Sequence, residues 1–407
     1  MVNKTKVLLS TFGPLHLIKS AEFLSPLVDI TVIQGWIPTW WNNWMIKPVS
    51  RIIGYDLGRT IRKRTPDCLD NRNYGLGLAD FIANASRFFV KSPTIQDFWL
   101  SAANHIYGKM SMKYIHNADV FHVRSGSGRG GAIQKAKELG MKVVVDHSIA
   151  HPHFMEISLS DEFKRNGTFF NLSEKTRFWK DVLDDCHEAD VIVVNSYFVQ
   201  RTFVENGFPS EKVAVAYLGV REDFWGLKQN YQMHDNKFKV LFTGGFGFRK
   251  GAEYILKAMQ ALESMGINTE LIVVGNYNEA LQLLNKYPVK GIRLIGFIPQ
   301  DDLKEYLSTS DVYLFPSLCE GCASSGMEAM ASGLPVIATE ESGLPISDGQ
   351  NGLLVPSKDV QAITEALLTL MKDEGLRKSL GQNAAHLIKE QFSWEMYAKK
   401  ILSIYSN

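Results

Sequence analysis

Two glutamates, Glu320 and Glu328, have seven residues between them in a segment rich in small side chains. The apolar run 312–315 before them predicts a buried strand, and the residues from about Ser325 onward predict a helix. A helix that begins at the carboxyl end of a strand offers unpaired backbone N–H groups and the positive end of its dipole, and both suit a phosphate. With one carboxylate on either side of that point, the segment fits an anionic ligand with the shape of a sugar nucleotide.

A second candidate binding segment is the glycine-rich loop that follows the apolar run 240–243. Gly244 and Gly245 allow the backbone to approach a ligand closely. Arg249 and Lys250, a few residues later, supply positive charge for a diphosphate. The alternative is a solvated basic loop whose glycines serve turns, and the loop alone does not decide between the two.

Composition bounds the class of protein. The chain has 407 residues, 45% of them hydrophobic and 21% charged, which is typical of a globular protein of two or three domains. The formal net charge of +1 gives no global field for a nucleic acid partner, and we expect none. No run of 18 apolar residues occurs, and residues 1–6 lead straight into a strand pattern, so we expect a cytoplasmic location.

The cysteines are too few for a disulfide framework. The four are Cys68, Cys186, Cys319 and Cys322. The last two form a C-x-x-C pair, but no second ligand pair follows it, so we predict free thiols in a loop and no metal site.

Short apolar runs alternate with helical patterns along both halves of the chain. The runs lie at 6–10, 30–32, 120–123, 142–145 and 191–195, and then at 240–243, 271–274, 292–295, 312–315, 336–338 and 353–355. This alternation predicts an α/β protein with two doubly wound, Rossmann-like domains of parallel strands that face a central cleft. The polar stretch 228–236 marks the boundary, so we predict domains at 1–228 and 237–390.

Taken together, the motifs resemble retaining glycosyltransferases of the large family 4, which have the GT-B architecture. The resemblance covers roughly 240–360 and consists of the loop 244–251, the segment Asp311–Ser317, the E-x7-E pair and the runs 333–338 and 351–355. In that architecture a terminal helix, here about 391–407, packs back on the first domain.

The resemblance assigns roles in the second half of the chain. Lys250 corresponds to the lysine that neutralises the donor diphosphate, Glu320 to the glutamate that faces the transferred sugar, and Glu328 to the one that holds the ribose hydroxyls. Backbone N–H groups at Ser324 and Ser325 correspond to those that bind the distal phosphate. Phe297 and Ile298 lie in the loop that borders the base. The family often has Arg directly after the first glycine of the basic loop, where this chain has Gly245, and we expect Arg249 to supply that charge.

In the first half, His147 ends a predicted buried strand and should point into the cleft. The resemblance places such a histidine near the donor sugar and the reactive centre. Gly13, after the first strand, is a candidate contact to the donor phosphate from the opposite wall. His151 and His153 lie nearby, but their spacing fits no metal site, and the family works without a metal ion.

The function that the resemblance implies is transfer of a sugar, with retention of anomeric configuration, from a nucleotide sugar to a glycan or a polyprenyl-linked acceptor. Bacterial surface polysaccharide synthesis is the common setting of such enzymes. No cofactor besides the nucleotide sugar is expected.

A competing fingerprint lies in the first half. Gly126–Gly131 satisfies G-x-G-x-x-G, and Asp146 follows twenty residues after Gly126, as in dinucleotide-binding folds. An NAD-dependent oxidoreductase is therefore an alternative, although it leaves the E-x7-E segment unexplained. A nucleotide-sugar epimerase with the same fold and a non-catalytic sugar-binding protein are two more.

The stretch 36–64 combines tryptophans with basic residues. Trp36, Trp40, Trp41 and Trp44 are followed by Arg51, Arg59, Arg62, Lys63 and Arg64. Such a mixture is what a protein lying on an anionic membrane, at the inner face of the cell membrane, would show. A packed helical subdomain or an aromatic acceptor pocket is the preferred interpretation, and membrane contact is the alternative.

Overall fold

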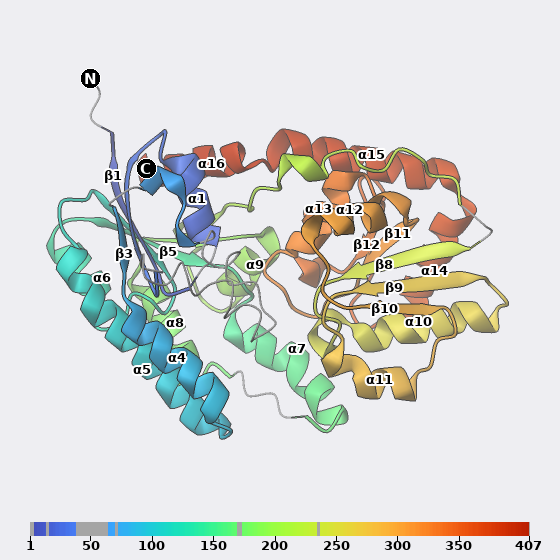
Figure 1. Ribbon diagram of the computed structural model, residues 1–407, viewed down its shortest axis with the longest axis horizontal. Coiled ribbons are helices and arrows are strands. Elements are labelled where there is room, and N and C mark those ends of the chain that lie inside the picture. The colour runs from blue at the N-terminus through green and yellow to red at the C-terminus, as the bar shows by residue number, and fades with distance from the viewer. Residues whose placement is uncertain are drawn as a thin grey trace, which may run out of the picture.

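The computed structural model describes residues 4–13, 16–37, 64–69, 72–168, 173–233 and 237–406. Within them, two parallel sheets lie side by side, and each has helices packed on both faces (Figure 1). The predicted pair of doubly wound α/β domains is therefore confirmed.

The described strands of the N-terminal sheet are β1 Lys6–Thr11, β2 Asp29–Gln34, β3 Asn73–Gly75, β4 Val120–Arg124, β5 Lys142–His147, β6 Val191–Val194 and β7 Val213–Val215. They are all parallel, in the order β3-β2-β1-β4-β5-β6-β7. The helices around them are α1 His16–Leu24, α4 Gly77–Phe89, α5 Pro93–Ser111, α6 Ala132–Glu138, α7 Pro152–Arg165, α8 Arg177–Glu188 and α9 Tyr197–Glu205. Strands β3 and β7 were not among the predicted runs, and β3, with the residues Asn-Tyr-Gly, has no apolar run.

The described strands of the C-terminal sheet are β8 Phe238–Thr243, β9 Thr269–Val274, β10 Ile292–Ile295, β11 Val312–Phe315, β12 Val336–Ala338 and β13 Leu353–Leu354. They too are all parallel, in the order β10-β9-β8-β11-β12-β13. The helices that follow these strands are α10 Ala252–Ser264, α11 Leu281–Lys286, α12 Gln300–Thr309, α13 Ser324–Ser332, α14 Val360–Lys372, α15 Glu374–Gln391 and α16 Trp394–Ser406.

The central strands are buried on both faces, which is why they consist of continuous apolar runs. Val143, Val144 and Val145 are consecutive in β5 and all fully buried, and so are the four residues of β11. A strand with one solvated face would alternate apolar and polar side chains. Burial on both faces ties the strand centres to the core and leaves the loops at the strand ends to carry function.

Each sheet reverses its strand order at one point, between β1 and β4 in the first sheet and between β8 and β11 in the second. The loops that leave the carboxyl ends of two such strands diverge to opposite faces and leave a crevice, where α/β proteins bind their ligands. The Gly244 loop follows β8 and the Glu320 loop follows β11. The fold therefore brings the two segments with candidate chemistry to one crevice.

The chain passes from one domain to the other twice, and the two connecting segments, near Val220 and near Phe392, lie against each other. The Val220 N–H donates to the Phe392 carbonyl at 2.8 Å. Just beyond Phe392, α16 packs on the N-terminal domain, where Trp394 stacks on Phe23 with ring centroids 5.6 Å apart. At its far end Tyr405 pairs with His122 of β4 at 2.7 Å. The terminal helix thus ties the second crossing to the first domain.

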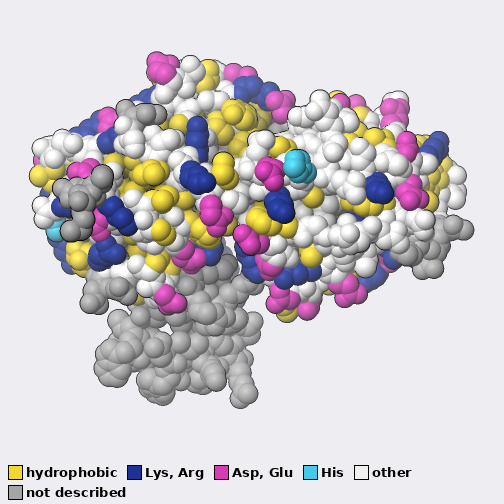
Figure 2. Space-filling model, turned by 90° about the horizontal axis from the view of Figure 1, so that it is seen from above, with side chains coloured by type: hydrophobic (Ala, Val, Ile, Leu, Met, Phe, Trp, Pro, Cys, Tyr) yellow, Lys and Arg dark blue, Asp and Glu magenta, His cyan; other side chains and the backbone are white. Residues whose placement is uncertain are grey.

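Charge is spread evenly over the face seen from above, where basic and acidic side chains alternate across both lobes (Figure 2). Among the described helices, none combines the length and the apolar character needed to cross a bilayer.

Candidate active site

The loops that follow β8 and β11 are joined backbone to backbone. The Arg249 carbonyl accepts hydrogen bonds from the Leu318 N–H at 2.8 Å and from the Ser317 hydroxyl at 3.1 Å. Gly251, at the start of α10, has φ +76°, and a Cβ there would lie 2.1 Å from the Pro316 carbonyl oxygen. Only glycine meets both conditions. This contact fixes the basic loop against the Glu320 loop.

A carboxylate and two cations meet at this junction. Arg249 Nη1 lies 2.6 Å and Lys250 Nζ 3.6 Å from Glu320 Oε1. Lys250 Nζ also lies 5.0 Å from the centroid of the Phe315 ring, and burial lowers the pKa of this lysine while Glu320 opposes that shift. With two cations for one carboxylate, the junction keeps a net positive charge at the carboxyl ends of β8 and β11.

The start of α13 lies beside this cluster and has no side-chain cap. Its N-cap residue is Ala323, which makes no capping hydrogen bond, and Ser324 is exposed. The Ser325 hydroxyl accepts a hydrogen bond from the Tyr313 hydroxyl at 2.8 Å. The first N–H groups of α13 therefore have no side-chain acceptor, as a helix end that binds an anion requires.

Glu328 lies one turn into α13 and contacts a different loop. Gln300 Nε2 donates to Glu328 Oε1 at 3.0 Å, and the side-chain oxygen of Gln300, Oε1, accepts from Arg221 Nη1 at 2.6 Å. Burial raises the pKa of Glu328 to about 7. Shortly before Gln300, Phe297 is 88% exposed and Ile298 is half-buried. The loop that leads to Gln300, the partner of Glu328, therefore exposes the aromatic ring of Phe297.

His147 lies at the end of β5 and is almost fully buried. Its Nδ1 pairs with the Ser125 hydroxyl at 3.0 Å, and its ring packs on Phe203 with centroids 4.9 Å apart. Burial lowers the pKa of His147 to about 3, so the ring is neutral, and Nε2 has no hydrogen-bond partner among the described residues. Gly13 follows β1 on the same edge of the sheet, and its carbonyl accepts from the Thr11 hydroxyl at 3.2 Å.

The His147 and Glu320 loops meet at the seam between the domains. A Cβ on Gly321 would lie 2.1 Å from the carbonyl oxygen of Ser148, so the residue after Glu320 touches the residue after His147. The Ser196 hydroxyl, at the N-cap of α9, donates to the Gly321 carbonyl at 2.5 Å. The fold therefore brings the candidate residues of the two domains to one seam.

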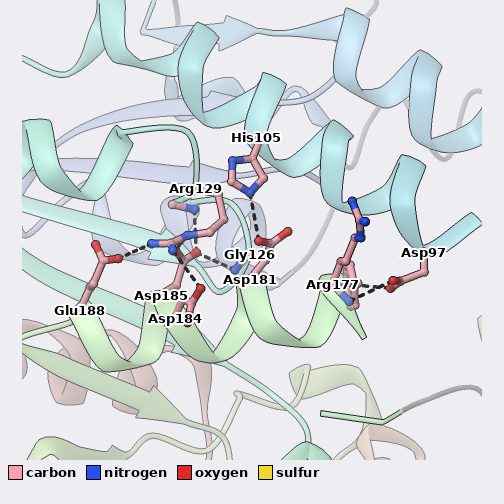
Figure 3. Close-up of polar contacts among 11 residues, drawn as sticks. Asp97, His105, Gly126, Arg129, Arg177, Asp181, Asp184, Asp185 and Glu188 are labelled. Atoms are coloured by element: carbon pink, nitrogen blue, oxygen red, sulfur yellow. Dashed lines mark hydrogen bonds and ion pairs between the residues drawn. The ribbon is translucent and has the colours of Figure 1, made fainter. Parts of the chain in front are cut away.

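The G-x-G-x-x-G loop of the first domain is already occupied by a side chain of the protein. Asp185 Oδ2 accepts from the N–H groups of Gly126 at 2.7 Å and Gly128 at 2.8 Å, as Figure 3 shows in part. Its Oδ1 pairs with Arg129 Nε at 2.7 Å, and Glu188 pairs with Arg129 Nη2 at 2.7 Å. These N–H groups are not available for a pyrophosphate.

Asp146, the acidic partner in the dinucleotide fingerprint, is also engaged. Its carboxylate pairs with Arg124 at 2.6 Å and with His16 at 2.9 Å, and it is buried. A carboxylate engaged by both Arg124 and His16 is not free to accept hydrogen bonds from a ribose. The geometry at both parts of the fingerprint argues against the oxidoreductase interpretation.

All four cysteines are free thiols, and burial raises the pKa of Cys319 to about 12. Among the described residues, no group of three His, Cys, Asp or Glu side chains is placed to hold a metal ion. His151 caps α7 by accepting from the His153 N–H, which explains one histidine of this region without a ligand.

Most of the aromatic and basic stretch, 38–63, lies outside the described residues, so both the packed subdomain or acceptor pocket and the alternative of membrane contact stay predictions there. At its end Arg64 is buried and pairs with Asp80 at 2.7 Å. The interpretation of Arg64 as a lipid-facing cation is therefore wrong, because the side chain is used inside the domain. No sequence pattern indicated Gln300 or Asp185, because their roles depend on loops and helices distant in sequence.

Comparison with known proteins identifies the second half of the chain. Residues 223–387 match the family described as "Glycosyl transferases group 1". The amylovoran biosynthesis glycosyltransferase of Erwinia amylovora is 28% identical over 79% of this chain and 79% of its own length. A capsular polysaccharide biosynthesis glycosyltransferase of Staphylococcus aureus is 23% identical over 54% of this chain and 61% of its own. The chain is a glycosyltransferase with the GT-B fold.

A solved structure agrees on the fold over the whole length. The Anabaena protein HepE, in complex with UDP, superposes with a TM-score of 0.62 at 15% identity and covers 99% of this chain and 100% of its own. In the glycosyltransferase, the family match begins at Asp223 and includes Lys250, Glu320 and Glu328.

Proposed function

We propose that the glycosyltransferase moves a sugar from a nucleoside diphosphate donor to a hydroxyl of a glycan or a polyprenyl-linked acceptor, with retention of anomeric configuration. The observation that carries this proposal is the cluster of Arg249, Lys250 and Glu320 beside the uncapped start of α13. Two cations and free helix amides suit a diphosphate, and the carboxylate is left for the sugar next to it. An uncharged ligand would have no use for this arrangement.

Arg249 and Lys250 share one carboxylate, so an incoming diphosphate competes for both of them. We propose that Arg249 turns from Glu320 to a phosphate oxygen when the donor binds. Glu320 is then free to accept hydrogen bonds from the sugar. The two cations stabilise the charge that develops on the leaving diphosphate. These side chains supply the positive charge, so the reaction is proposed to need neither metal nor cofactor and to continue in the presence of EDTA.

The far end of the donor is proposed to lie at Glu328. Its carboxylate accepts hydrogen bonds from the ribose hydroxyls, and Gln300 holds it in place at 3.0 Å. Phe297 and Ile298 border the base, and the N–H groups of Ser324 and Ser325 bind the distal phosphate. The UDP bound to the Anabaena neighbour supports a nucleoside diphosphate as the ligand.

On the N-terminal side, His147 is proposed to orient the sugar as a neutral hydrogen-bonding group, because its lowered pKa keeps it uncharged. Gly13 borders the phosphate from the opposite wall. Binding and orientation of the two substrates, with charge stabilisation of the leaving group, then account for catalysis without a nucleophile supplied by the protein.

The domain at 1–228 is proposed to hold the acceptor and the domain at 237–390 the donor, with the acceptor part of a bacterial surface polysaccharide. The Erwinia and Staphylococcus relatives, named for amylovoran and for capsular polysaccharide biosynthesis, support this setting. We propose that the protein works in the cytoplasm, at the inner face of the membrane.

The test is a panel of UDP-, GDP- and ADP-sugars, incubated with and without glycan and polyprenyl-linked acceptors, with released nucleoside diphosphate as the readout. Release that requires an acceptor supports transfer. Conversion of the donor to another sugar without an acceptor indicates an epimerase, and binding without turnover indicates a non-catalytic protein. The anomeric coupling constant of the product, measured by NMR, tests retention.

A variant pair connects the assay to the site. Glu320→Gln should slow transfer by roughly 30- to 1,000-fold, the usual effect of removing one preorganised contact in an active site. Glu340→Gln, an exposed glutamate paired with Arg201, is the matched control and should retain full activity. Equal rates in the two variants would remove Glu320 from the reaction.

A further inference from the structure

Helix α4 presents its large apolar side chains to solvent and its small ones to the protein. Phe81 is 71% and Phe88 83% exposed, and with Leu78 they lie on one face at spacings of three and seven residues. Ala79 and Ala83 occupy the buried face. A surface helix normally has the opposite arrangement. Packing against the described residues of the domain therefore does not explain the aromatic residues of α4.

The exposed apolar surface continues across the turn onto α5. Phe88 and Phe89 contact edge to face with centroids 5.0 Å apart, and Phe98 and Trp99 do so at 5.5 Å. We call the whole surface the α4–α5 face, and its exposed members are Leu78, Phe81, Phe88, Phe89, Phe98 and Trp99. In Figure 1 these two helices lie at the lower left, remote from the C-terminal domain. So large a group of exposed apolar side chains marks an interaction surface.

Among the described residues of α4, of α5 and of the turn between them, the exposed charged side chains without a partner are basic. Arg87 and Lys91 are exposed at the turn between the helices. Arg177, from the start of α8, lies over the Phe98 ring at 5.2 Å. The two acidic residues of α4 and α5 are both engaged internally. Asp80 pairs with Arg64, and Asp97 accepts from two N–H groups at the start of α8 (Figure 3).

We propose that the α4–α5 face docks on an anionic lipid bilayer, with its aromatic rings in the interfacial region and its basic fringe on the headgroups. Aromatic residues flanked by Lys and Arg are the combination that binds such a surface, because apolar burial and electrostatic attraction act together. A second copy of the chain would bring the same basic fringe against itself. The face is distinct from the stretch 38–63 and does not depend on the proposed reaction.

The experiment is sedimentation of the full-length protein with vesicles of phosphatidylcholine alone or with 30% phosphatidylglycerol. We expect binding to the anionic vesicles at low salt and much weaker binding to neutral ones. Phe88→Ser with Phe89→Ser should lower the bound fraction about tenfold or more, since both rings leave the interface. Arg87→Ala with Lys91→Ala should weaken binding roughly thirtyfold at low salt and little at high salt.

The matched control is Ile157→Ser on α7, a side chain exposed to a similar degree outside the face, which should bind like the wild type. Circular dichroism establishes that each variant is folded. Wild-type affinity in the Phe88/Phe89 variant overturns the proposal, because contact would then occur elsewhere. Absence of vesicle binding also overturns it, as does a dimer that the same two substitutions dissociate, since the occupant would then be a second copy.

Discussion

The two glycine-rich loops of this glycosyltransferase have the same strand-loop-helix arrangement, but side chains of different charge contact them. Gly126–Gly131 connects β4 to α6, and Gly244–Gly251 connects β8 to α10. Both follow a buried parallel strand and open a helix. In the first loop Asp185 occupies the backbone N–H groups, whereas in the second Lys250 and Arg249 gather around a carboxylate from a neighbouring loop. Glycine spacing therefore predicts the turn, but the side chains packed against the loop decide whether it can bind a ligand.

The difference comes from the elements that lie across each loop. Helix α8 brings Asp185, Asp184 and Glu188 to the first loop, and all three contact Arg129 (Figure 3). In that loop Arg129 is paired and the backbone N–H groups of Gly126 and Gly128 are occupied, so the loop serves as structure. In the second loop Glu279 accepts from the Phe248 N–H at 3.3 Å, on the side away from the start of α13. Beside the uncapped start of α13, Arg249 and Lys250 share the single carboxylate of Glu320. The net positive charge left there is what a diphosphate requires.

The largest expected effect is on stability. Asp185→Ala leaves a buried Arg129 without its closest partner and two loop N–H groups without an acceptor. We expect a loss of about 3–5 kcal/mol in the free energy of unfolding, measured by urea denaturation. Asp184→Ala is the control on the same helix. Its carboxylate is partly exposed and 3.5 Å from Arg129, so a change within about 1 kcal/mol is expected. Equal stability of the two variants would show that the loop does not depend on Asp185.

The next effect falls on the other loop and on activity. Lys250→Ala removes a cation from the proposed diphosphate site, and transfer should slow by about 2–4 kcal/mol of barrier, or roughly 30- to 1,000-fold. The measurement is the release of nucleoside diphosphate from whichever donor the panel identifies. The control is Lys257→Ala. Lys257 lies in α10, pairs with Glu253 and should leave the rate unchanged when it is replaced. A rate loss of similar size in both variants would point to general damage in place of a diphosphate contact.

A smaller effect should appear in the pH profile. Burial raises the pKa of Glu328 to about 7, so the side chain is protonated below that pH and becomes a carboxylate above it. If this carboxylate accepts hydrogen bonds from the ribose hydroxyls, kcat/KM for the donor should rise between pH 6 and pH 8. Below the pKa of Glu328 the rise is up to about tenfold per pH unit. Glu328→Gln should flatten this limb, and Glu340→Gln should retain it. A limb that persists in Glu328→Gln belongs to another group.

The two loops differ in how far the sequence alone predicts their role. The buried strands and the E-x7-E segment could be predicted because apolar runs and small-residue turns are local patterns. The same local logic made the Gly126 loop resemble a dinucleotide site. Asp185 lies more than fifty residues downstream, and its sequence neighbourhood gives no sign that it will reach Gly126. Gln300 reaches Glu328 across loops in the same way. Contacts of this kind depend on how helices pack, which no single-sequence pattern encodes.

The smallest predicted effect separates the glycines of the second loop. Gly244 has φ +115°, so Gly244→Ala should destabilise the protein by about 1 kcal/mol or more. Gly245 is exposed, with no heavy atom within 4 Å of an added Cβ and no left-handed φ. Gly245→Ala should therefore be neutral or stabilise by up to about 1 kcal/mol in the same urea titration, because it restricts only the unfolded chain.

No glycine of the first loop can be replaced by alanine as freely as Gly245. The variants Gly244→Ala and Gly245→Ala therefore test whether the two loops differ in packing. A Cβ on Gly130 would lie 2.2 Å from the His105 carbonyl, and one on Gly128 would lie 2.5 Å from Ile133. A fully packed loop has no residue that can be enlarged freely, whereas a loop that faces a ligand site has open space on one side. Gly245→Ala should accordingly retain stability and shift donor affinity, since its new methyl group occupies that space. A large loss of stability at Gly245 would mean that the second loop is as closely packed as the first.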